Sequence, residues 1–113
     1  MLLGARDSRN ELLRWLHFGG TQTLDSYGAS GGWETIPPDH IRFLEGTQLY
    51  HETESHIFVH ANFDPDLPMA EQPREVLLWR FLDEAAARPH LSGKTVVVGH
   101  TPQRSGTVLD LGH

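Results

Sequence analysis

Two apolar runs of the chain carry a histidine at their C-terminal end. His60 follows the run that begins at His56, and His100 follows the run that begins at Lys94. Each run predicts a short buried strand with an imidazole where the strand ends. In open α/β sheets ligands and metals collect at that edge, so the two imidazoles could form half of a metal site. The alternative is two unrelated strand-end histidines held by backbone hydrogen bonds.

The residues around His100 support a tight turn. Gly99 has no side chain, so the backbone there can pass closely beneath a bound ion or anion. Thr101 can form a hydrogen bond nearby, and Pro102 stiffens the exit from the strand. No aspartate follows a predicted strand to complete a metal site, so we expect the chain to hold only part of an active site.

Composition excludes several kinds of protein. The 113 residues include no cysteine, which excludes disulfides and thiolate metal ligands. The net charge of −6 argues against binding to the nucleic-acid backbone. The chain has no apolar run long enough to span a membrane and no pattern of a signal peptide. We therefore expect a cytoplasmic protein that binds neither nucleic acid nor membranes.

We expect one partial domain over residues 1–113, with a helical, cap-like region at 1–46 and a strand-rich part at 47–113 that holds the histidine motifs. A capping box begins at Ser8 and leads into an amphipathic helix that ends at Gly19-Gly20. A flexible loop follows at Gly28–Gly32. A second helix has Pro38 in its first turn, and its expected apolar face is Ile41, Phe43 and Leu44.

The second part of the chain predicts a small sheet and one helix. Gln48–Glu52 and His56–His60 form an expected antiparallel hairpin, and Lys94–Val98 is the strand with the most buried composition. A helix is expected over Glu75–Ala87, and Gly106–Leu111 could begin one more strand. The expected buried stripe of that helix consists of Val76, Leu78, Trp79 and Leu82. Trp15 and Trp79 are expected to pack in the core.

Several segments resemble a known family in the right order. Val59-His60-Ala61 and Gly99–Pro102 are similar to two metal motifs of the PPP-type serine/threonine protein phosphatases, which are calcineurin-like metallophosphoesterases. Gly19–Gly28 resembles the Gly-Gly-x-x-Thr-Leu-x-Ser-Tyr-Gly segment of the bacterial branch, and Leu77–Arg80 resembles its Leu-Leu-Trp box. The resemblance implies a mixed α/β fold, namely a partial metallophosphoesterase β-sandwich flanked by helices whose N-terminal strands are missing.

The resemblance also implies a site. His60 and His100 would each ligate the second metal of a dinuclear centre, with Mn²⁺ expected and Fe or Zn as alternatives. The two ions would polarise phosphate oxygens and supply a bridging hydroxide. Arg80 would bind the substrate phosphate, although relatives have Leu-Leu-Trp-x-Arg and Arg80 follows Trp79 directly. The alternative is a solvated helix arginine paired with Asp83 or Glu84.

The family's Gly-Asp-x-His-Gly, Gly-Asp-x-Val-Asp-Arg-Gly and Gly-Asn-His-Glu/Asp motifs are absent from this sequence. We therefore expect an inactive fragment with no assignable general acid, weak metal binding, and a separate chain that carries the N-terminal half. The expected substrate is a phosphoprotein or a small phosphoester. One alternative is a hydrolase similar to symmetrical diadenosine tetraphosphatases. Another is a non-catalytic remnant whose acidic surface and open sheet edges bind a protein.

Overall fold

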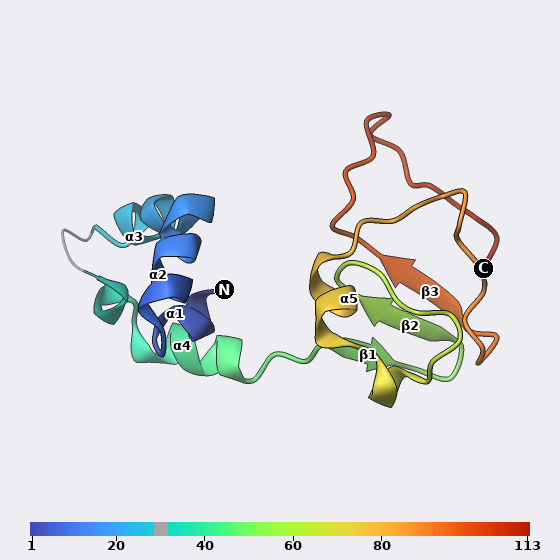
Figure 1. Cartoon of the computed structure of the whole chain (residues 1–113), viewed down its shortest axis with the longest axis horizontal. Coiled ribbons are helices and arrows are strands. Elements are labelled where there is room, and N and C mark those ends of the chain that lie inside the picture. The colour runs from blue at the N-terminus through green and yellow to red at the C-terminus, as the bar shows by residue number, and fades with distance from the viewer. Residues whose placement is uncertain (29–31) are drawn as a thin grey trace. The chain divides into compact units, whose positions relative to one another are not determined.

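The structure is a computed structural model, which describes residues 1–28 and 32–113. The described residues form two compact units, Met1–Thr47 and Gln48–His113. The first unit is helical and the second contains a three-stranded sheet, so the chain is a mixed α/β protein (Figure 1). Positions 29–31 of the expected loop Gly28–Gly32 lie outside the described residues.

The described part of the first unit, residues 1–28 and 32–47, contains four short α-helices. The Ser8 hydroxyl accepts a hydrogen bond from the Glu11 N–H at 3.5 Å, so the predicted helix start is confirmed. Gly19 has a φ of 100°, which only a residue without a side chain adopts at low cost, and it turns the chain. The bounds are α1 Leu2–Ala5, α2 Arg9–Trp15, α3 Thr21–Ser26 and α4 Pro38–Glu45, with a wide turn at Leu16–Gly20 and a single turn at Trp33–Thr35.

Trp15 belongs to the apolar core of the first unit and is 6% exposed, as predicted. Ile41 of α4 packs into the same core, but Phe43 is 73% exposed, so its predicted burial is wrong. Phe43 lies two residues after Ile41, and each residue of an α-helix turns by about 100°, so the two side chains point to different sides.

The sheet of the second unit has the strand order β1-β2-β3, with β1 Tyr50–Glu52, β2 His56–Val59 and β3 Thr95–Val98 (Figure 1). β1 and β2 pair antiparallel, which confirms the predicted hairpin. β2 and β3 pair parallel, from His56 opposite Thr95 to Val59 opposite Val98. The crossover between them contains one turn at Met69–Glu71 and α5, Arg74–Trp79.

The predicted helix Glu75–Ala87 is wrong at its C-terminal end. α5 stops at Trp79, and Arg80 is extended, with φ −71° and ψ 121°. Val76 and Leu77 are buried, but Trp79 is 48% exposed, so the prediction that it packs in the core is also wrong. Leu82 lies beyond the helix. The chain leaves the helix because residues 81 and 82 bond to the two loops that carry the histidines.

β2, and not β3, is the most buried strand. Ile57 is fully buried and Val59 is 7% exposed, whereas Val97 of β3 is 44% exposed. Within the part of the chain that the structure describes, no strand pairs with the other edge of β3, and the expected strand Gly106–Leu111 does not form. One face of β3 and its free edge therefore stay accessible.

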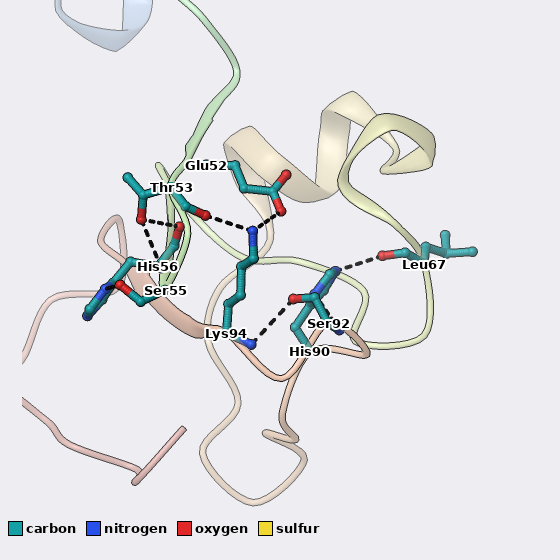
Figure 2. Close-up of polar contacts among 8 residues, drawn as sticks. All are labelled: Glu52, Thr53, Ser55, His56, Leu67, His90, Ser92 and Lys94. Atoms are coloured by element: carbon teal, nitrogen blue, oxygen red, sulfur yellow. Dashed lines mark hydrogen bonds and ion pairs between the residues drawn. The ribbon is translucent and has the colours of Figure 1, made fainter.

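Polar contacts hold the start of β3 beside the β1–β2 turn (Figure 2). The Lys94 Nζ atom lies 2.8 Å from Glu52 Oε1 and donates to the Thr53 carbonyl at 2.7 Å. Next to it the buried His90 ring bonds through Nε2 to the Leu67 carbonyl at 2.9 Å. These contacts tie the entrance of β3 to two other segments, and so help to fix its register against β2.

Candidate functional site

The structure brings His60 and His100 together. His60 directly follows β2, and His100 lies two residues after the end of β3. Because the two strands are parallel and in register, both histidines lie at the same end of the sheet, where β2 and β3 reach their C-termini. His60 Nε2 lies 3.2 Å from His100 Nδ1, and the ring centroids are 5.0 Å apart. His60 is exposed and His100 is partly buried, so ions and ligands can reach the pair.

The backbone of the two histidine loops is tightly apposed. The Gly99 N–H donates to the His60 carbonyl oxygen at 3.0 Å, and a Cβ atom at position 99 would lie only 3.2 Å from that oxygen. The group that lies closely against Gly99 is therefore the His60 carbonyl, whereas a bound ion or anion was expected from the sequence. His100 itself has a φ of 58°, in the left-handed region that non-glycine residues adopt at a cost. The loops thus hold a defined and strained geometry at the histidine pair.

The separation of the ring nitrogens fits two ligands of one ion. Two nitrogens at about 2.1 Å from a metal lie about 3.0 Å apart at a right angle and about 3.4 Å apart at the tetrahedral angle. The observed 3.2 Å lies between these values. A hydrogen bond between two neutral rings has a similar length. In residues 1–28 and 32–113, no group of three or more His, Cys, Asp or Glu side chains could hold an ion.

Two exposed aromatic rings lie beside the pair. The Phe81 ring is 4.9 Å from the His100 ring at an interplanar angle of 34°, and the Trp79 ring is 6.1 Å away and edge-on at 86°. Sequence reasoning missed Phe81 and assigned Trp79 to the core. The signal for Phe81 was weak, because a helix was predicted through this position and a helical Phe would have pointed elsewhere.

Three hydrogen bonds fasten the segment Leu77–Leu82 to the histidine loops. The Ala61 N–H donates to the Leu77 carbonyl at 2.9 Å, and Asn62 Nδ2 donates to the Phe81 carbonyl at 2.9 Å. The Leu82 N–H donates to Thr101 Oγ1 at 2.7 Å, which is the contact that the Thr101 hydroxyl makes near His100. The aromatic rings are therefore placed by the same loops that place the imidazoles.

Arg80 lines a cavity of about 720 Å³ that also borders Asn62, Phe81 and the free edge of β3. Arg80 is not a helix residue, and among the described residues it makes no ion pair with Asp83 or Glu84, so the alternative of a paired helix arginine is wrong. His60 and His100 are not part of the cavity wall, although Phe81 is. Whether Arg80 binds phosphate stays a prediction.

A second arginine at the cavity is already paired. Arg88 contacts Asp66 with both terminal nitrogens of its guanidinium group, Nη2 at 2.6 Å and Nη1 at 3.2 Å. The hydrogen bond from Arg88 holds the pKa of the exposed Asp66 carboxyl below its usual range. Arg80 is therefore the arginine of the cavity wall that has no carboxylate partner in the described part of the chain.

No protein-family model matches this chain, and neither the curated proteins nor the solved structures include a match to it. The resemblance to the phosphatases therefore depends on the sequence motifs alone. In the described residues we find no helix with the length and apolar content that a bilayer crossing requires.

Proposed function

We propose that the chain is part of a metal-dependent phosphoester hydrolase of the PPP phosphatase type, with a partial metallophosphoesterase fold. In this proposal His60 Nε2 and His100 Nδ1 ligate one divalent ion, with Mn²⁺ as the expected metal. The observation that carries the proposal is the 3.2 Å separation of these nitrogens at the shared end of two parallel strands. The order of the family-like motifs along the chain adds to it.

Each residue has a defined task in this proposal. The two imidazoles hold the ion at the sheet edge, and Gly99 keeps their loops in contact through its bond to the His60 carbonyl. When bound, a dinuclear centre activates a water molecule and polarises the phosphate. The Arg80 guanidinium, which has no carboxylate partner among the described residues, is available to hold phosphate oxygens with its planar fork. The expected substrate is a phosphoprotein.

The remaining ligands of such a centre would come from outside the residues described here. Two imidazoles leave an ion short of four or more ligands, so metal affinity of the chain alone should be low. We therefore propose that a separate polypeptide with the missing metal motifs completes the site, and that this chain alone has little or no hydrolytic activity.

The experiment is a titration of the purified chain with Mn²⁺, in which bound and free ion are distinguished by electron paramagnetic resonance. His60→Ala and His100→Ala should each weaken binding by a similar factor, because either change leaves a single ligand. His51→Ala is the matched control, since His51 is an exposed histidine of β1 that lies opposite Phe58. It should bind Mn²⁺ as the unchanged chain does.

Equal Mn²⁺ affinity in all four proteins would overturn the proposed metal site. Hydrolysis of p-nitrophenyl phosphate by the same samples tests the expected inactivity. Turnover that is lost in His60→Ala would mean that the chain completes its own site, for example by self-association, and the need for a second polypeptide would be wrong.

A non-catalytic protein-binding module is the second candidate, because the sheet has an accessible edge. The far edge of β3 is unpaired among the described residues, and Phe58 and Val97, which lie opposite each other, are 43% and 44% exposed. A partner could add a strand there. A folded chain whose weak metal binding does not depend on His60 would favour this second function.

A further inference from the structure

Large aromatic side chains are exposed where the histidine pair lies. Phe81 is 63% exposed and Trp79 is 48% exposed, although both rings contact the ring of His100. Leaving such rings partly in water gives up part of the free energy that their burial would supply. Exposed apolar groups that gather at one place mark a binding site more often than scattered ones do.

The exposure of Phe81 does not come from a loose loop. Its carbonyl accepts the bond from Asn62, and the Leu82 N–H of the same peptide group donates to Thr101, so this peptide group is held by both histidine loops. To reach this position the chain leaves α5 at Trp79, ahead of a stretch whose sequence favours a helix. The backbone therefore gives up helical hydrogen bonds to place an aromatic ring next to His100.

We propose that Phe81 and Trp79 form an aromatic wall that receives the planar aromatic group of a phosphate ester. This inference rests on the proposed function, which puts the phosphate at the histidine pair. Arg80 lies between the two aromatic residues in the chain and lines a cavity that Phe81 also lines. Offset or edge-on contact between aromatic rings contributes beyond the burial of area.

The ligand class is thus a phosphate ester with a planar aromatic group near the phosphate, and its source could be a phosphorylated tyrosine side chain or a nucleotide. Phosphoserine has no ring, so it would gain nothing from the wall. The shared chemistry is a flat ring within a few bonds of the phosphate. Phenyl phosphate and adenosine monophosphate represent the two sources, and cyclohexyl phosphate and ribose 5-phosphate are their counterparts without an aromatic ring.

The test is a set of binding titrations of the ¹⁵N-labelled chain with these four esters in the presence of Zn²⁺. Binding is monitored by NMR as the shift of the Trp79 indole N–H signal. We expect phenyl phosphate to bind roughly 2- to 10-fold more tightly than cyclohexyl phosphate, the range that ring–ring contacts supply. Phe81→Leu should remove this preference. Phe43→Leu is the matched control, because Phe43 is an exposed phenylalanine of the first unit.

Equal affinity within both pairs of esters, with and without the aromatic ring, would overturn the inference, and so would the absence of saturable binding of any of the four esters. If Phe81 only supports the His100 ring, Phe81→Leu would weaken both esters by the same factor, which also overturns it. A preference for adenosine monophosphate over ribose 5-phosphate, without one for phenyl phosphate, would identify a nucleotide as the source. The Mn²⁺ titration of His60→Ala is independent of these ratios, so failure of the proposed metal site is recognised separately.

Discussion

Gly99→Ala tests whether the close contact between the two histidine loops sets the geometry of the pair. The Gly99 N–H is bonded to the His60 carbonyl oxygen, and an alanine Cβ would lie 3.2 Å from that oxygen. Ordinary contact begins at 3.4 Å, so one of the loops must move by a few tenths of an ångström. Because the neighbouring atom belongs to the backbone, a side-chain rotation cannot relieve the contact.

The expected effects have different sizes for folding and for metal binding. Crowding by one added carbon typically lowers the free energy of unfolding by about 1 to 3 kcal/mol. The displacement also changes the position of His60 relative to His100, and altering a group that orients a metal ligand typically lowers affinity about 10-fold or more. We therefore expect Gly99→Ala to fold and to bind Mn²⁺ about 10-fold more weakly.

The assay is the Mn²⁺ titration, combined with urea unfolding to compare stabilities. Gly93→Ala is the control, because Gly93 has a φ of 71° and no atom lies within 4 Å of the position that an alanine Cβ would take. An alanine there costs about 1 to 2 kcal/mol through its backbone conformation, without touching the histidine pair. If Gly99→Ala binds Mn²⁺ as the unchanged chain does, or if Gly93→Ala loses as much affinity, the reasoning about the loop contact is refuted.

Leu77→Ala should lower the free energy of unfolding of the second unit by about 2 to 5 kcal/mol, because Leu77 is 1% exposed and packs against the sheet. Leu13→Ala, at a position that is 57% exposed, should change stability by less than about 0.5 kcal/mol, and urea unfolding that shows equal losses would contradict this account. Arg88→Gln should raise the pKa of Asp66 towards its usual range, since the Arg88 hydrogen bond lowers it. The pair therefore stabilises the fold above the usual Asp pKa and stops doing so as the pH falls through the lowered value, and an unchanged ¹³C titration midpoint of Asp66 in Arg88→Gln would show the pairing to be absent.

The sheet could be predicted from the sequence because its signals are local. The β1–β2 hairpin and the position of β3 follow from apolar runs with short polar segments between them. Parallel neighbouring strands have their C-terminal ends at the same end of the sheet, so the proximity of His60 and His100 follows from the positions of the two strands in the sequence. The strands and their register do not show whether the pair binds a metal ion.

The end of α5 could not be predicted, because bonds to distant segments decide it. Residues 80–87 include good helix formers, yet Asn62 and Thr101 bind the backbone of Phe81 and Leu82 and draw it out of the helix. The partners in each of these two hydrogen bonds are 19 residues apart in the sequence. Phe81 therefore joins the site through tertiary structure that no periodicity in the sequence reveals. The exposure of Val97 has a similar cause, since composition cannot reveal whether a strand has a neighbour on its far side.

The backbone at His100 gives a physical reason to prefer a ligand-binding role for the pair. A histidine with a φ of 58° carries a conformational cost of about 1 kcal/mol or more. The bond between His60 and His100 is exposed to water, where a neutral hydrogen bond contributes only about 0.5 to 1.5 kcal/mol, so it barely offsets that cost. In a completed site, an ion held by both rings and by further ligands would supply more than this bond does. Strain at a solvent-accessible pair of potential ligands is therefore easier to explain by binding than by the stability of the fold.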